Sequence, residues 1–254
     1  QRLPKYYKEG VALSEMSRIL YTYDSMDRIC LEQDIYYDEA TKKFKTINSK
    51  ANIYDLNGNV LKTVDALGYE SGTGTTIIEK VVTGYGTNYS YNDANLLLTT
   101  LSPETNINGL TFDVKYTYDG AGRKVSETNA NNVVTNYDYD KLGRLTKTTV
   151  VDTTEKVLQQ NTYDSLGNVL TQTDGNGNTT TFSYNNLGLL RSQTTPGDAS
   201  MDSYTITNQY NTMGQVAYQK DSIGKETLFT YNHNGQVLSQ TEQKQDGTQP
   251  ITVS

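Results

Sequence analysis

A tyrosine followed by Asp or Asn and then, three residues later, by Gly recurs along most of this chain and constrains its fold more than any other feature. Nine copies, two of which lack the glycine, begin at Tyr23, Tyr54, Tyr91, Tyr118, Tyr139, Tyr163, Tyr184, Tyr210 and Tyr231. The shortest step between copies is 21 residues and occurs three times, so 21 residues is the basic period and longer steps contain insertions. A fixed period of this kind predicts a repeat protein, in which each unit buries its apolar face only against neighbouring units.

The motif itself predicts a β-hairpin. Asp or Asn at the first turn position and Gly at the fourth favour a type I turn whose last residue is left-handed and forms a bulge. We expect such bulges at Gly122, Gly143, Gly167, Gly188, Gly214 and Gly235. This register places opposite one another Asp119 and Arg123, Asp140 and Arg144, Tyr139 and Leu145, and Tyr163 and Val169. Weaker turns about half a period later are predicted at Asp65, Asn129, Asp174 and Asp221.

The strand before each turn reads aromatic-x-Tyr in six copies, for example "YTY" at residues 116–118 and "FTY" at residues 229–231. Alternate strand residues share a face, so the units are expected to build a ladder of aromatic rings. The rings either pack on one another as scaffold or stack on sugars, because tyrosine has an apolar body and a polar tip. The candidates for glycan stacking are Tyr116, Tyr118, Tyr137, Tyr139, Tyr184 and Tyr231.

The third turn position is often apolar, although exposed loop tips are normally polar. We interpret these residues as contacts to a neighbouring layer; the alternative is scattered surface apolar residues, which need no explanation. They are Met26, Leu142, Leu166, Leu187, Met213 and Ile223.

The pattern predicts one repeat array over residues 1–254. Residues 1–20 form an atypical lead-in with a short helix expected at 10–20. Residues 21–115 are irregular repeats with insertions, residues 116–240 are regular repeats, and residues 241–254 are an incomplete last strand. Segments 70–76 and 195–200 are expected to be insertion loops, and no segment reads as a domain linker.

Composition excludes several classes of function. The net charge is -7 and no basic stripe is present, so nucleic-acid binding is not expected. The lone Cys30 excludes an internal disulfide, and the longest apolar run falls far short of the ~20 residues of a transmembrane helix. The 21 tyrosines argue against disorder, since disordered chains are poor in aromatic residues. The chain begins at Gln1, and we expect it to be a piece of a longer protein or a processed product.

No constellation of residues predicts catalysis, a metal site or a cofactor. His233 is the only histidine and occupies a variable turn position. The segments at 55–59 and 174–178 resemble half of an EF-hand loop but lack its final glutamate, so we interpret them as turns. Asp119, Asp140 and Asp164 occupy the same repeat position, which argues for a shared structural role.

The stretch "YTYDGAGRKVSETNANNVVTNYDYDKLGRLTKT" at residues 116–148 resembles the RHS or YD-repeat family, and the resemblance extends over about residues 21–240. Later copies depart from the pattern by replacing Asp with Asn and Arg with Asn, Leu or Gln. The positions that carry the repeat signature are Tyr118, Asp119, Gly122, Arg123, Tyr139, Asp140, Gly143, Arg144, Tyr163, Asp164, Gly167, Tyr184, Gly188, Tyr210, Gly214, Tyr231 and Gly235.

The resemblance implies an all-β fold: tandem hairpins in a curved, spiralling antiparallel strip that forms part of a hollow shell. In bacterial toxins of this family the shell encloses a C-terminal toxic domain, which is released by self-cleavage at an Asp-Pro-x-Gly motif. This chain has no Asp-Pro pair, so only wall material is expected.

The sequence therefore predicts a non-catalytic shell segment of a large secreted or cell-surface bacterial protein. Its expected partners are the rest of its parent chain and an encapsulated C-terminal domain, and its exposed sheet edges invite self-association. The alternative function is a carbohydrate- or cell-surface-binding module that uses exposed tyrosines.

Overall fold

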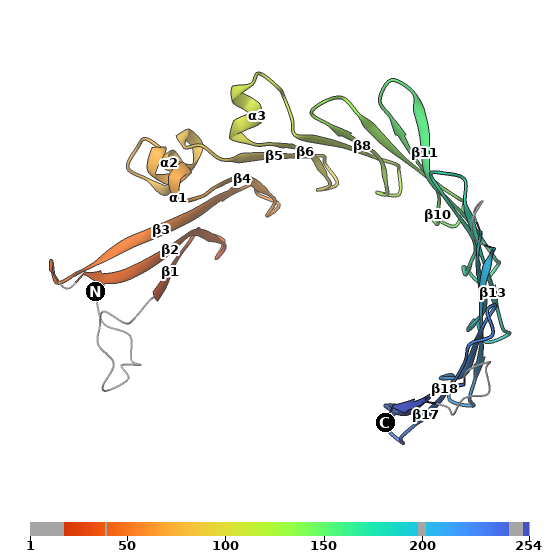
Figure 1. The fold of residues 1–254 in the computed structure, drawn as a ribbon. Helices are drawn as coiled ribbons and strands as arrows, with labels where there is room; N and C mark the ends of the chain where they lie inside the picture. Colours follow the sequence, from red (N-terminus) through yellow and green to blue (C-terminus); the bar gives the residue numbers. More distant parts are fainter. Residues whose placement is uncertain (1–17, 39, 198–201, 244–250, 254) are drawn as a thin grey trace. The chain divides into compact units, whose positions relative to one another are not determined.

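A computed structural model describes residues 18–38, 40–197, 202–243 and 251–253. Within these residues the chain forms nineteen β-strands, assigned to one sheet, and three short helices (Figure 1). It divides into two compact units, residues 1–133 and residues 134–254. The predicted all-β class is confirmed.

Unit 1 contains eight strands and the three helices. The strands are β1 Arg18–Tyr23, β2 Ile29–Asp38, β3 Lys43–Tyr54, β4 Val60–Val64, β5 Thr87–Tyr91, β6 Leu97–Leu101, β7 Val114–Tyr118 and β8 Lys124–Asn129. The helices are α1 Ala66–Ser71, α2 Ile77–Thr83 and α3 Pro103–Ile107. Each strand from β2 to β8 pairs antiparallel with the strand before it.

Unit 2 continues the strand-turn-strand pattern, without a helix among its described residues. Its strands are β9 Val134–Tyr139, β10 Leu145–Val151, β11 Glu155–Tyr163, β12 Val169–Asp174, β13 Thr179–Tyr184, β14 Leu190–Thr195, β15 Tyr204–Tyr210, β16 Val216–Asp221, β17 Glu226–Tyr231, β18 Val237–Gln243 and β19 Ile251–Val253. Consecutive strands again pair antiparallel throughout. The tandem hairpins expected from the repeat are confirmed.

The turn between β9 and β10 shows why the motif folds as it does. One carboxylate oxygen of Asp140 accepts the backbone N–H groups of Leu142 and Arg144, and the N–H of Gly143 donates to the Asp140 carbonyl oxygen at 3.0 Å. Gly143 has a φ of 82°, in the left-handed region that L-residues with a side chain rarely adopt. All six glycines expected at bulges have positive φ, so that prediction is confirmed.

Three turns place another residue where the repeat has glycine. Asp27, Asn95 and Asn132 have φ values of 59°, 61° and 62°, as expected from the tolerance of Asp and Asn for this conformation. The weaker turns predicted at Asn129, Asp174 and Asp221 are confirmed by the same backbone hydrogen bonds.

The turn predicted at Asp65 is wrong, because Asp65 caps a helix. Its side chain accepts the N–H of Gly68 and starts α1, and a capping box between Thr76 and Glu79 starts α2. Segment 70–76, expected to be a plain loop, spans the end of α1 and the connection to α2. The signal Thr-x-x-Glu is present in the sequence, but it begins at Thr76, the last residue of the glycine-rich stretch that we expected to be a loop.

The helix expected at residues 10–20 is wrong where it can be compared. Residues 18–20 lie in β1, where Ile19 pairs with Asp34 and Leu20 pairs with Gln33 of β2. Residues 10–17 lie outside the described residues, as do residues 198–200 of the second expected loop. Pairing with a neighbouring strand overrides a weak local helix propensity.

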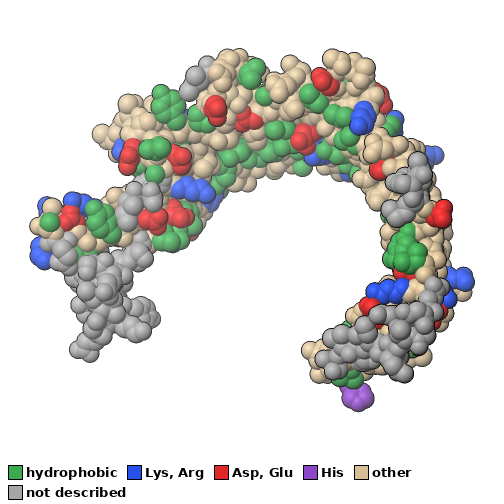
Figure 2. All heavy atoms as spheres, viewed as in Figure 1, with side chains coloured by type: hydrophobic (Ala, Val, Ile, Leu, Met, Phe, Trp, Pro, Cys, Tyr) green, Lys and Arg blue, Asp and Glu red, His purple; other side chains and the backbone are tan. Residues whose placement is uncertain are grey.

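The apolar core of unit 1 is small and lies where helices cover the sheet. Leu31, Ala51, Val64 and Val81 are buried, and α1 and α2 contact β3 and β4 beside them (Figure 1). In unit 2 the described buried residues are the polar Thr149, Asn161, Asp221 and Thr227. Figure 2 shows, on the face in view, apolar side chains at the surface among polar ones. A single-layer sheet of this kind must be stabilised by contacts between neighbouring hairpins.

Candidate functional site

A hydrogen-bonded clamp joins several of the hairpins to the next one along the chain. Arg144, after the turn of β9–β10, donates from Nε to the Asp140 carboxylate at 2.7 Å and from Nη1 to the backbone carbonyl of Asp164 at 2.7 Å. Its guanidinium carbon lies 4.7 Å from the ring centroid of Tyr163, in the following hairpin. Arg144 therefore contacts its own turn, the repeat tyrosine of the next hairpin and the turn of that hairpin.

Unit 1 contains the same clamp. Arg28 pairs with Asp24 at 2.7 Å, donates to the carbonyl of Asp55 at 2.7 Å and lies 4.7 Å from the ring centroid of Tyr54. The two clamps are thus built from the same repeat positions, more than a hundred residues apart in the chain.

The second part of the clamp is a hydrogen bond from each of several repeat tyrosines back to the preceding hairpin. The hydroxyl of Tyr163 donates to the carbonyl oxygen of Leu145 at 2.6 Å, and Leu145 is the first residue of the return strand in the preceding hairpin. The same relationship joins Tyr54 to Ile29, Tyr118 to Leu97, Tyr184 to Val169, Tyr210 to Leu190 and Tyr231 to Val216, at 2.7–3.0 Å. These tyrosines therefore bridge successive hairpins through ring contact and a backbone hydrogen bond.

The charge of the clamp changes along the chain. Backbone and guanidinium hydrogen bonds from Arg144 hold the pKa of Asp140 below its ordinary value, and the side-chain amide of Asn168 lowers the pKa of Asp164. In later copies the ion pair is replaced by amides: Asn211 donates to Gln215 at 2.8 Å, and Gln215 donates to the carbonyl of Gly235 at 3.3 Å. A neutral amide thus takes over the bridging role of the arginine.

The six candidate glycan-stacking tyrosines are all partly buried. Tyr118, Tyr184 and Tyr231 have their hydroxyls committed to backbone carbonyls, and the Lys124 amine lies 5.5 Å from the ring centroid of Tyr116. Sugar stacking on these rings stays a prediction.

The apolar turn tips are exposed. Met26 is 52% exposed, and Leu142, Leu166, Leu187, Met213 and Ile223 are 71–81% exposed. The contact with a neighbouring layer that we expected is therefore not made among the described residues.

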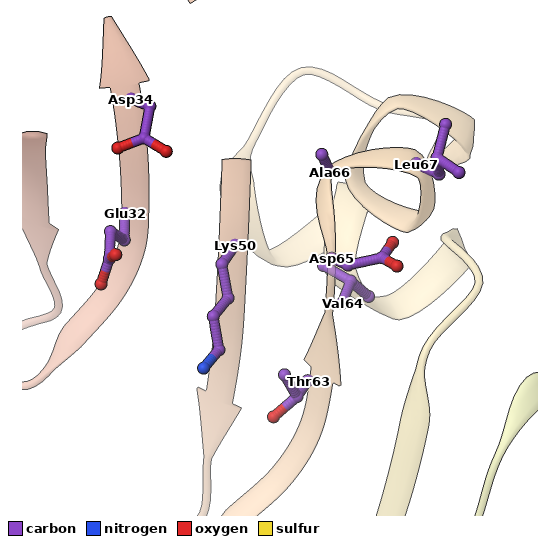
Figure 3. Close-up of a pocket in the computed structure, with 8 residues that line it drawn as sticks. All are labelled: Glu32, Asp34, Lys50, Thr63, Val64, Asp65, Ala66 and Leu67. Atoms are coloured by element: carbon purple, nitrogen blue, oxygen red, sulfur yellow. The ribbon is translucent and has the colours of Figure 1, made fainter. Parts of the chain in front are cut away.

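A pocket that the sequence did not indicate lies beside α1 in unit 1. It has a volume of about 340 Å³ and is lined by Glu32, Asp34, Lys50, Thr63, Val64, Asp65, Ala66 and Leu67. Figure 3 shows Glu32 and Asp34 on β2 and Lys50 on the neighbouring β3. The carboxylate of Asp65 is already used in the α1 cap at 2.8 Å, and Glu32 and Lys50 are a cross-strand pair. The pocket depends on α1, which is why the repeat pattern did not reveal it.

The residues considered for catalysis or metal binding occupy turns. His233 is exposed at a hairpin tip, and the Asp174 carboxylate accepts hydrogen bonds from the backbone and side chain of Asn178. Among the described residues no group of three or more His, Cys, Asp or Glu side chains could hold a metal ion. Within that part of the chain no helix is long and apolar enough to cross a membrane.

Comparison with known proteins points to the same repeat. The RHS repeat family model matches residues 118–155 and 163–200, and no curated protein matches the chain.

Solved structures share the fold across most of this chain. The crystal structure of TcdB2-TccC3-Cdc42 superposes with a TM-score of 0.71 at 17% identity, covering 93% of this chain and 12% of that one. The crystal structure of TcdB2-TccC3 gives a TM-score of 0.71 at 17% identity, covering 95% and 13%. This chain therefore spans about an eighth of the length of the chains it matches. Residues 118–155 and 163–200 are therefore identified as RHS repeats, and the chain shares the fold of these solved structures.

Proposed function

We propose that this chain is a wall segment of a YD-repeat shell and acts through its geometry rather than through catalysis. The observation that carries the proposal is the clamp: six of the nine repeat tyrosines donate to the preceding hairpin, and Arg28 and Arg144 donate to the following one. Such units extend a sheet indefinitely and do not close a core of their own. The aspartates of the repeat serve the turns, which supports a non-catalytic role.

The shell is proposed to enclose or present a toxin or effector domain of the same parent protein. This step depends on the family, because the chain covers only 12% of the matched TcdB2-TccC3-Cdc42 chain. We also propose that the parent protein is secreted or displayed at the cell surface, as the enclosed-toxin role requires. The identity of the enclosed domain is a separate question from the role of the wall.

Electron microscopy of the intact parent protein, purified from its source, tests the proposal. A closed hollow particle with density inside it is the expected result. An open strip or an extended rod would contradict encapsulation. The repeat array would then present the toxin or effector domain without enclosing it.

Self-association through the sheet edge is a further part of the proposed behaviour of the isolated chain. In the described residues β1 pairs with β2 on one side, and its side chains Ile19 and Tyr23 are 53% and 54% exposed. An edge strand with exposed apolar side chains is a template for pairing with another chain. In the parent shell the same edge would be available for pairing with a further strand.

A further inference from the structure

The pocket beside α1 in unit 1 carries charges of both signs that the fold leaves unpaired. Among the described residues, the carboxylates of Glu32 and Asp34 and the amine of Lys50 form no hydrogen bond or ion pair. Elsewhere in the sheet such groups do pair: Lys220 and Glu226 lie directly opposite each other and join at 2.7 Å. Glu32 and Lys50 lie opposite each other in the same way, so their charges remain available to a ligand.

The strand register fixes the order of these charges. Asp34 lies two residues after Glu32 on β2, so both carboxylates lie on the same face of the sheet. Lys50 lies on that face of β3, about 4.8 Å from β2, the usual distance between paired strands. Figure 3 shows the two acidic side chains on one strand and the lysine on its neighbour. The pocket is therefore acidic along β2 and basic along β3.

The third side of the pocket is apolar and comes from the end of β4 and the start of α1. Val64 is fully buried there, and Leu67, in the first turn of α1, is 77% exposed. Ala66 lies between them and adds a methyl group. The carboxylate of Asp65 accepts the N–H of Gly68 at 2.8 Å and is thus committed to the helix cap. Acidic, basic and apolar surfaces follow one another across β2, β3 and β4.

An α-amino acid with an apolar side chain carries the complementary groups. Its ammonium suits the carboxylates of β2, its carboxylate suits the amine of β3, and its side chain suits the apolar wall. The pocket volume of about 340 Å³ falls within the ~300–1,000 Å³ of small-molecule sites. A neutral ligand would desolvate the charges without pairing them, and an anion would meet two carboxylates. The lining therefore favours a zwitterion over either.

We propose that this pocket binds a free amino acid with an apolar side chain. Glu32 and Asp34 hold its ammonium, Lys50 holds its carboxylate, and its side chain contacts Ala66 and Leu67. The site depends on α1, which interrupts the repeat, so it is a property of this insertion rather than of the repeat unit. It also goes beyond the wall function, because it gives one segment of the wall a small-molecule ligand.

An NMR titration of the ¹⁵N-labelled 254-residue chain with L-leucine tests the proposal. Leucine is expected to shift the backbone amide signals of Glu32, Lys50 and Leu67. Two analogues each lack one charge: 3-methylbutan-1-amine has no carboxylate, and 4-methylpentanoate has no ammonium. Each should bind about twofold to fivefold more weakly than leucine, the usual effect of one partly exposed ion pair.

Variants assign each charge of the ligand to its partner. Asp34→Asn should weaken the binding of leucine and of the amine and leave that of 4-methylpentanoate no weaker. Lys50→Gln should weaken the binding of leucine and of 4-methylpentanoate and leave that of the amine no weaker. Lys220→Gln is the matched control, because Lys220 is also a cross-strand lysine but lies outside the pocket, and it should change none of these affinities.

The apolar wall has its own test. Leu67→Ala removes most of the exposed side chain, while alanine keeps the helix propensity of α1. It should weaken leucine binding and leave glycine binding unchanged, because glycine has no side chain to contact the wall. This variant also keeps the proposal testable if a change of charge on β2 or β3 prevents folding.

Three results would overturn the proposal. The first is the absence of leucine-dependent shifts at the pocket in the folded chain. The second is an analogue with one charge that binds as tightly as leucine, which would make the pocket a simple cation or anion site. The third is leucine binding that none of Asp34→Asn, Lys50→Gln and Leu67→Ala weakens, which would place the ligand elsewhere. None of these results depends on whether the parent protein forms a closed shell.

Discussion

The guanidinium carbon of Arg144 lies 4.7 Å from the ring centroid of Tyr163, and the Tyr163 hydroxyl donates to the carbonyl of Leu145, the residue that follows Arg144. Two adjacent residues of one hairpin therefore hold one tyrosine of the next, from its ring face and from its hydroxyl. These contacts couple the stability of one hairpin to that of the next without a second layer of structure packed on the sheet.

Tyr163→Phe keeps the ring and removes the hydroxyl, so the Leu145 carbonyl loses one of its two side-chain donors and keeps the hydrogen bond from Asn161. We expect a local destabilisation of ~1 kcal/mol, the usual net contribution of a hydrogen bond. Amide hydrogen exchange over β10 and β11 measures it, because a repeat array opens locally as well as globally. Tyr85→Phe is the control, since Tyr85 is 64% exposed, and it should leave exchange unchanged. Equal effects of the two substitutions would contradict the clamp.

Arg144→Lys keeps the charge and loses the planar group that bonds both Asp140 and the Asp164 carbonyl while lying over Tyr163. We expect faster exchange at the turn of β11–β12 as well as at the turn of β9–β10, with a cost of ~1 kcal/mol. Arg191→Lys, at an exposed position of β14, is the control. An effect confined to the turn of Arg144 itself would mean that the arginine does not join the hairpins.

Gly167→Ala places a Cβ at a residue with φ of 94° where no atom lies within 4 Å, so its cost is purely conformational. We expect a destabilisation of ~1–2 kcal/mol, measured by urea unfolding. Gly120→Ala, also in open space but without a positive φ, is the matched control and should be close to neutral. Gly167→Asn should cost less than Gly167→Ala, because Asn95 and Asn132 adopt this conformation in their own turns.

Acid should loosen the aspartate turns before the asparagine turns. The folded-state pKa of Asp140 is lowered by backbone and guanidinium hydrogen bonds from Arg144, and that of Asp164 by the Asn168 amide. A lowered carboxylate pKa contributes stability that is present above the unfolded-state pKa and is lost as the pH falls through the folded-state pKa. Asn211 and Asn232 do not titrate, so their turns should keep their amide signals at that pH.

Two-dimensional NMR spectra recorded from neutral to acid pH test this order through the turn amides of Gly167 and Gly214. Asp164→Asn should remove the pH dependence at Gly167 and leave Gly214 unchanged. Simultaneous loss of both signals in the wild type would show that the turns do not open independently.

The edge of β1, which among the described residues pairs only with β2, should cause the isolated chain to associate. Tyr21→Lys places a charge on this strand, where Tyr21 is 40% exposed, and we expect it to lower the association measured by sedimentation velocity. Leu56→Lys changes a turn tip that is 88% exposed and should leave association unchanged. If Leu56→Lys lowers association instead, the chains meet through their turn tips.

The hairpins, their bulges and their register followed from the sequence because each depends on residues close together in the chain. Asp140, Gly143 and Arg144 lie within five residues, so turn chemistry alone specifies their geometry. Tyr163 opposite Val169 follows directly from that turn, and the structure pairs them.

Contacts between hairpins, and departures from the repeat, needed the tertiary structure. The Tyr163 hydroxyl reaches a carbonyl 18 residues earlier, and no local preference encodes which carbonyl that is. The α1 pocket depends on a helix that interrupts the pattern. The side-chain amides of Gln159 and Gln172 donate to Asn161, which is buried only once the strands are assembled. The sequence by itself thus determined the unit and its period. The tertiary structure decided how the units are fastened and where pockets form, because those contacts join residues that only the assembled sheet brings together.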